Sequence, residues 1–261
     1  MTATQTEGAE RRDASAHPTT APTHSQASSP KADFIAGIRT TLPLLIGMLP
    51  LAFILGAQGA QHGLSAVGMA LMTSMNFAGG SEFAAVALWS AAPSFLVIFM
   101  TTWLVNCRHI VLGASLTPWM QQARLPLWKT LLAFFLMCDE CWAFSMQEIE
   151  RRRKLGRPAA ELFSWHYHMG VGLTLWSSWF FTAALGAAAG GSLGDLTRWG
   201  FLMAFPATFI GLVAAMRPAL PKCAPMVLSA IASAVASLWL PLHWSILIGT
   251  LAGLALAAIK D

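Results

Sequence analysis

Five ionisable residues lie inside long apolar stretches of the sequence: Glu82, Arg108, His109, Asp139 and Glu140. A charge within such a stretch is costly in a membrane and usually marks a functional site. A guanidinium fork matches the two oxygens of a carboxylate, and an acidic side chain complements an ammonium group. These residue types together predict a binding site for a zwitterion such as an amino acid. Each acid is also a candidate carrier of a coupling proton, because burial favours the neutral form of a carboxyl group.

The same residues allow a structural interpretation, in which Arg108 clamps two helices by pairing with Glu82 or Asp139. His109 either titrates near neutrality or serves as a hydrogen-bonded histidine of the bundle. A third interpretation is acid–base catalysis by His109 with Asp139 and Glu140. Because no nucleophile or metal-ligand cluster accompanies them in the sequence, we expect no enzyme activity, no cofactor and no metal site.

A further motif, Trp165-His166-Tyr167-His168, has the spacing of a metal-ligand pair. It opens an apolar stretch next to aromatic residues, which is typical of the aromatic belt at a membrane interface. We therefore expect these side chains to lie at an interface.

A polar, glycine-rich run interrupts the second apolar stretch just before Glu82. It contains Asn76, Gly79, Gly80 and Ser81. Irregular backbone at this depth is tolerated only where protein or water covers it, and discontinuous helices commonly form the substrate sites of secondary transporters. Close helix packing through small residues is the alternative. We favour a broken helix whose freed backbone groups bind substrate.

The elements that position these residues must lie mostly in lipid. Hydrophobic residues make up 56% of the 261 residues and charged residues only 11%, against about a quarter charged in soluble domains. The sequence predicts an all-α, polytopic transmembrane bundle with seven or eight spans of about 20 residues. Candidate spans cover residues 40–61, 64–90, 93–118, 127–147, 164–190, 198–217, 224–240 and 243–259. The last two count separately because one helix over 224–259 would be about 54 Å long.

Basic residues between the spans predict the orientation, because cytoplasmic loops are enriched in Lys and Arg. The 148–161 segment holds the strongest such cluster. Its five basic residues are Arg151, Arg152, Arg153, Lys154 and Arg157. With eight spans both termini are cytoplasmic, whereas Arg124 and Lys129 fall outside, against the rule. These loops explain the net charge of +4, so we expect no nucleic-acid partner.

The first 33 residues differ in composition from the rest of the chain. They are rich in Ala, Thr, Ser and Pro and contain no apolar run, so they cannot bury enough surface to become ordered. We expect residues 1–33 to form a disordered cytoplasmic tail and residues 34–261 to form a single transmembrane transporter domain.

Three signatures follow one another along the chain. They are Pro43-x3-Gly47-x2-Pro50 with Gly56; Phe77-Ala78-Gly79 followed by Ser81; and Asn106-x-Arg108-His109 with Gly113-Ala114-Ser115-Leu116 and a downstream Asp139-Glu140. Their order and spacing resemble the AzlC family, the large subunit of branched-chain amino acid exporters. The likeness covers roughly residues 34–261 and is carried mainly by residues 34–145.

The resemblance implies a secondary transporter in the lipid bilayer of the cell inner membrane. It would export branched-chain or other small apolar amino acids with a small AzlD-type membrane partner, and Asn106 would join the site. The chain has Glu82 where the family commonly shows Gln. An alternative is the permease subunit of an ATP-driven transporter, with residues 148–161 docking an ATPase, because the chain has no phosphate-binding loop of its own.

Overall fold

A computed structural model describes residues 29–190, 220–240 and 242–260, and every regular element in these ranges is a helix. The predicted all-α fold is confirmed for this part of the chain. The predicted span 198–217 and nearly all of the predicted tail lie outside the described residues.

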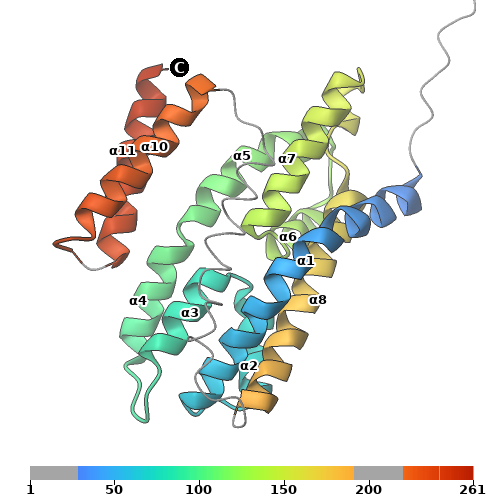
Figure 1. Cartoon of the computed structure of the whole chain (residues 1–261). Helices are drawn as coiled ribbons and strands as arrows, with labels where there is room; N and C mark the ends of the chain where they lie inside the picture. The colour runs from blue at the N-terminus through green and yellow to red at the C-terminus, as the bar shows by residue number, and fades with distance from the viewer. Residues whose placement is uncertain (1–28, 191–219, 241, 261) are drawn as a thin grey trace, which may run out of the picture.

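Among the described residues, three helical columns are long and apolar enough to cross a bilayer (Figure 1). The first is α1 (Pro30–Gln61), the second joins α4 (Phe95–Asn106) to α5 (Arg108–Gln122), and the third is α8 (Trp165–Ala189). α4 and α5 form one column because Cys107, between them, keeps helical dihedral angles of φ −52° and ψ −27°.

α1 begins ten residues before the predicted span. Ser29 caps its amino end by accepting a hydrogen bond from the Ala32 N–H at 3.1 Å, and Pro30 occupies the first turn, where no helical N–H is needed. Pro43 and Pro50 lie within the helix without ending it.

Between α1 and α4 the chain enters the molecule and returns to the same end. α2 (Ala66–Asn76) and α3 (Gly79–Leu88) are separated by residues 77–78. The outer ends of α2 and α3 lie close together, because His62 Nδ1, before α2, lies 3.1 Å from the carbonyl oxygen of Trp89, directly after α3. Near the break, Trp176, in the middle of α8, donates Nε1–H to the Ser74 carbonyl at 2.8 Å. Each helix is about 15 Å long, half the hydrocarbon core, so the pair is a re-entrant hairpin.

A second re-entrant hairpin enters from the opposite end. It consists of α6 (Leu127–Phe135) and α7 (Asp139–Lys154). At the start of α6, the Lys129 carbonyl accepts a hydrogen bond from Trp165 Nε1 at 3.2 Å. Near the end of α7, Arg152 forms an ion pair with Asp33 at 2.7 Å. Both ends of this hairpin therefore lie beside the amino ends of α1 and α8.

The structure therefore differs from the expectation that 64–90 and 127–147 cross the bilayer fully. Hydropathy counts apolar residues but does not detect that the chain reverses direction at a break. The predicted break in the second stretch is confirmed, and the break at residues 136–138 was not predicted. Arg124 and Lys129 now lie at the same end as the basic 148–161 segment, which removes their conflict with the predicted orientation.

A close α1–α8 contact forms the centre of the bundle. A Cβ atom on Gly56 would overlap the Ala183 carbonyl oxygen, and one on Gly186 would overlap the Phe53 carbonyl oxygen. These glycines let the two backbones touch, as small residues do in membrane helix pairs. The first hairpin packs against this pair, with Met69 and Val86 in the same core as Leu55.

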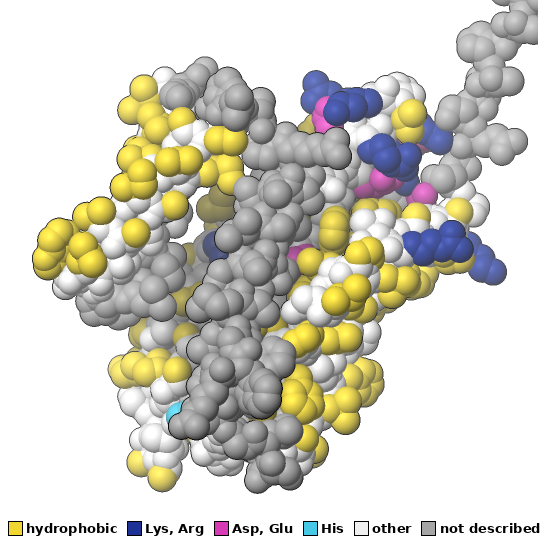
Figure 2. Space-filling view, in the orientation of Figure 1, with side chains coloured by type: hydrophobic (Ala, Val, Ile, Leu, Met, Phe, Trp, Pro, Cys, Tyr) yellow, Lys and Arg dark blue, Asp and Glu magenta, His cyan; other side chains and the backbone are white. Residues whose placement is uncertain are grey.

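Two further helices, α10 (Leu220–Ala236) and α11 (Leu242–Lys260), form an antiparallel pair, and α11 also contacts α4 (Figure 1). Figure 2 shows Lys and Arg side chains gathered at one end of the view, near the ends of α1 and α7, with hydrophobic side chains over much of the remaining surface. None of the α4 residues is buried. This distribution is that of a helical membrane protein.

Candidate functional site

The tips of the two hairpins meet at one pocket in the middle of the bundle. The pocket has a volume of about 30 Å³, enough for about one water molecule. Its lining comes from both tips and from α1, α5 and α8: Met48, Leu51, Phe77, Ala78, Gly79, Gly80, Arg108, His109, Cys138, Asp139, Glu140 and Trp179. Six of the ten predicted site residues are in this lining.

Hydrogen bonds from its own polar side chains fix the conformation of the first tip. Phe77 has φ +44°, a left-handed conformation that is strained for a bulky residue. Asn76 donates Nδ2–H to Ser81 Oγ at 2.8 Å, and Ser81 donates its hydroxyl to the Ala78 carbonyl at 2.8 Å. Gly79 then starts α3 in the pocket wall. The amino end of α3, with its partial positive charge, therefore faces the pocket.

Glu82 stabilises this tip through hydrogen bonds and does not line the pocket. Its side chain is fully buried. Oε1 accepts the Ala78 N–H at 3.1 Å, and Oε2 accepts Trp179 Nε1–H at 2.7 Å. Both carboxylate oxygens are thus hydrogen-bonded, and the described residues place no cation in an ion pair with Glu82. Glu82 ties the first hairpin to α8.

Arg108 and Asp139 form the charged centre of the pocket. Their ion pair, Nη2 to Oδ2, measures 3.0 Å, and their side chains are 35% and 17% exposed. Of the two predicted pairings of Arg108, the one with Asp139 is present. Arg108 Nε is buried without a hydrogen-bond partner among the described residues. Asp139 and Glu140 occupy the first turn of α7, where the helix dipole stabilises negative charge.

A pair of hydrogen-bonded amides lines a larger groove that adjoins this pocket at His109. Asn106 donates Nδ2–H to Asn76 Oδ1 at 3.1 Å, and His109 Nδ1 lies 3.2 Å from the Asn106 carbonyl oxygen. The groove has a volume of about 500 Å³. It is lined by Met75, Asn76, Asn106, His109, Ile110, Gly113, Ala114, Phe134, Phe135 and Met137. His109 lines both spaces.

The sequence did not reveal the contributions of Trp179, Met48, Leu51 and Cys138. These residues carry no charge, and only the fold brings them to the tips. A tryptophan in an apolar stretch is usually an interfacial anchor. The signal for Trp179 is indirect, because the buried acid at position 82 requires a hydrogen-bond donor.

The histidine motif at the start of α8 is only partly interfacial. Trp165 packs edge-to-face on Trp128, and Lys129 Nζ lies 4.8 Å from the Trp165 ring centre. His168, however, is fully buried: its Nε2 lies 3.0 Å from the Ala133 carbonyl oxygen and its Nδ1 lies 2.8 Å from Ser145 Oγ. The helix turn points this ring inward, so the expected interfacial position does not hold for His168.

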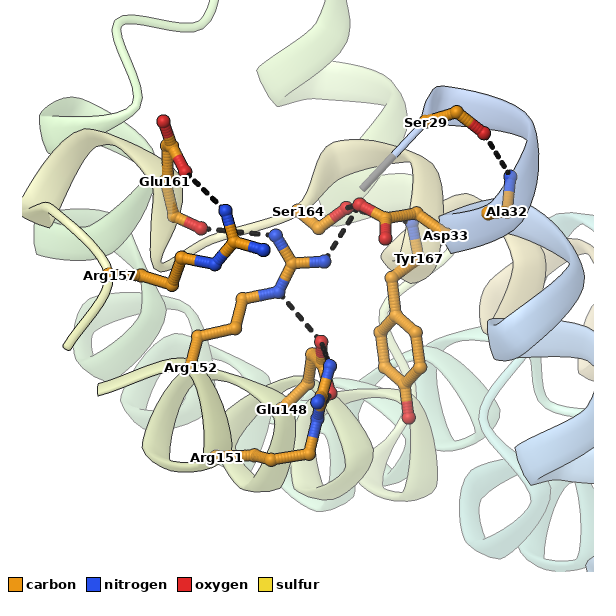
Figure 3. Close-up of polar contacts among 10 residues, drawn as sticks. All are labelled: Ser29, Ala32, Asp33, Glu148, Arg151, Arg152, Arg157, Glu161, Ser164 and Tyr167. Atoms are coloured by element: carbon orange, nitrogen blue, oxygen red, sulfur yellow. Dashed lines mark hydrogen bonds and ion pairs between the residues drawn. The ribbon is translucent and has the colours of Figure 1, made fainter. Parts of the chain in front are cut away.

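A separate ion cluster joins the amino end of α1, the basic carboxyl end of α7 and the residue that precedes α8 (Figure 3). Arg152 binds Asp33 at 2.7 Å and Glu148 at 2.7 Å, and Ser164 donates its hydroxyl to Asp33 at 2.6 Å. Burial alone would raise the pKa of Glu148, but hydrogen bonds from Arg151 and Arg152 outweigh it and hold this pKa below its ordinary value. These two arginines are therefore engaged within the protein.

Comparison with known proteins identifies the family. Residues 43–193 match the family described as AzlC protein. The chain belongs to the AzlC family. The matched segment includes both hairpins and all the pocket residues.

Three relatives share the matched region. YgaZ, an inner membrane protein of Escherichia coli K12, is 29% identical over 162 residues, which are 62% of this chain and 63% of YgaZ. An uncharacterized membrane protein of Archaeoglobus fulgidus is 28% identical over 165 residues, 63% of this chain and 66% of the relative. The branched-chain amino acid transport protein AzlC of Bacillus subtilis is 31% identical over 114 residues, 44% of each chain. The chain thus matches less than two thirds of each relative. No solved structure matches it.

Proposed function

We propose that this protein is a secondary transporter that exports branched-chain or other small apolar amino acids across the inner membrane. One observation carries the proposal: two re-entrant hairpins from opposite ends meet at a pocket that holds one guanidinium and two acids. Broken helices that meet near the bilayer midplane are typical of secondary-transporter substrate sites. The printed name of the Bacillus subtilis relative supports the substrate class.

The charges of the pocket suit the two ends of an amino acid. The α-carboxylate would lie between Arg108 and the amino end of α3 at Gly79 and Gly80. A Cβ atom on Gly80 would lie 3.7 Å from Arg108 Nη2, so the guanidinium and the helix end face the same small space. The ammonium group would bind Asp139. The substrate carboxylate thus takes the place of Asp139 beside Arg108. The substrate ammonium group takes the place of Arg108 beside Asp139.

The same geometry indicates why transport requires movement. A pocket of about 30 Å³ holds no amino acid, so substrate enters only after the tips separate. Transport would therefore require the hairpins to move against the closely packed α1–α8 pair, opening the pocket to one end and then to the other. Energy would come from an ion gradient, and a small AzlD-type subunit would accompany the chain.

Variants of the ion pair test this proposal. Arg108→Ala and Asp139→Asn each remove a charged hydrogen bond to substrate, worth about 1.5–3 kcal/mol, so leucine efflux should fall roughly 10- to 100-fold. Arg153→Ala is the control, because Arg153 is 68% exposed at the basic end. Arg108→Lys keeps the charge but loses the planar fork and should recover only part of the activity. Unchanged efflux in membrane-inserted Arg108→Ala and Asp139→Asn proteins would rule out this site.

A further inference from the structure

The apolar groove beside the pocket takes no part in binding the two charged groups of the substrate. Gly113 of α5, Phe134 of α6 and Met137 of the break after α6 lie in its wall. The charged pocket has room for about one water molecule. A branched aliphatic side chain does not fit the pocket in this closed arrangement, whereas the groove, at about 500 Å³, is large enough for one.

We infer that this groove holds the aliphatic side chain of the transported amino acid, an inference that rests on the proposed function. His109 lines both spaces, so they adjoin. At the junction Asn106 donates to Asn76, while Asn106 Oδ1 is buried and has no hydrogen-bond partner among the described residues. A buried acceptor without a donor is costly. The substrate ammonium, or a water beside it, supplies that donor.

Gly113 determines the width of the groove. A Cβ atom at this position would lie 3.4 Å from Phe134 Cε1 and 3.7 Å from Met137 Cε. One methyl group is accommodated there, but a larger side chain fills the space between α5 and α6. Gly113 and Phe134 are thus specificity-determining residues, because they line the groove where α5 and α6 lie close together.

Binding to the purified full-length protein tests this inference without a transport step. Thermal stabilisation by alanine, valine, leucine and phenylalanine gives a dissociation constant for each ligand, because a ligand that binds the folded state raises its stability. Gly113→Leu should weaken leucine binding at least about tenfold relative to alanine binding, since a single methylene group in an apolar pocket changes discrimination about 10- to 200-fold. Phe134→Ala should shift the preference towards phenylalanine.

A matched control accompanies these variants: Leu131→Ala shortens an exposed residue of α6 outside the groove and should not change the ligand preference.

Each failure has its own signature. If wild-type protein binds leucine but Gly113→Leu and Phe134→Ala leave the order of preference unchanged, the groove holds a lipid chain or no ligand, and only this inference is overturned. If Gly113→Leu does not fold, Phe134→Ala decides alone. If the wild-type protein binds none of the four amino acids, the proposed function itself is overturned.

Discussion

At the scale of single residues, Glu82 shows how a buried charge can serve structure. The three membrane acids have different surroundings: Asp139 faces a guanidinium, Glu140 lies at the start of α7, and Glu82 accepts two hydrogen bonds away from the pocket. Sequence reasoning grouped them because each one interrupts an apolar stretch. It could not separate their roles, since the donors to Glu82 come from the reversed backbone at Ala78 and from Trp179, which is 97 residues away.

Glu82→Ala should destabilise the protein more than Glu82→Gln. The alanine variant leaves two buried donors, the Ala78 N–H and Trp179 Nε1–H, without acceptors, at about 1–3 kcal/mol each. The glutamine variant keeps the shape and one acceptor, so its loss should be about half as large. Thermal unfolding in detergent measures the order of these losses of stability. Adding Trp179→Phe to the Glu82→Ala variant should cause little further loss.

Leucine efflux should persist in Glu82→Gln, because the family resemblance gives Gln as the usual residue at this position. Abolished efflux in folded Glu82→Gln protein would instead make the charge of Glu82 part of ion coupling.

At the scale of elements, the sequence predicted helices and one break, but not the paths of the broken segments. The run from Asn76 to Glu82 signalled the first break through its glycines and polar residues. The second break, at residues 136–138, contains only Leu, Met and Cys, and such residues give no turn signal. That the two tips meet depends on tertiary contacts, such as those of Trp176 with Ser74 and of Trp165 with Lys129, which no local pattern encodes.

The ion cluster that joins α1, α7 and α8 should make stability depend on pH. The pKa of Glu148 in the folded protein lies below its ordinary value, so the carboxylate's contribution is complete above the ordinary glutamate pKa of about 4.3 and is lost as the pH falls through the folded value. The unfolding temperature of wild-type protein should exceed that of Glu148→Gln at pH 7, and the difference should disappear at low pH. Glu150→Gln, at a site 51% exposed, is the control. A difference that does not vary with pH would contradict this account.

At the scale of the whole molecule, two units run in opposite directions. The first unit is α1 followed by the first hairpin, and the second unit is the α4–α5 column followed by the second hairpin. In each unit the column crosses the bundle, and the re-entrant hairpin enters from the end that the column has just reached. Inverted units of this kind place a substrate site where they meet, which is where the pocket lies. The basic residues at one end then predict that this end is cytoplasmic.

Labelling of single cysteines distinguishes this arrangement from eight full crossings. After replacement of Cys107 and Cys223, which are partly exposed, Arg124→Cys and Arg153→Cys should both react with a membrane-impermeant maleimide from the cytoplasmic side. Ala91→Cys, in the turn before α4, should react from the opposite side. In eight full crossings Ala91 and Arg153 would share a side and Arg124 would lie opposite, so that pattern would contradict the re-entrant hairpins.

Efflux of radiolabelled leucine and valine from proteoliposomes, with alanine for comparison, tests the proposed export function most directly. It is run with and without a proton gradient, and with and without a co-reconstituted small AzlD-type subunit. We predict gradient-dependent efflux in which leucine and valine exceed alanine, and the loss of this efflux in Arg108→Ala. No efflux of any of the three from folded, reconstituted protein with its partner would contradict the assignment of this pocket as an amino acid export site.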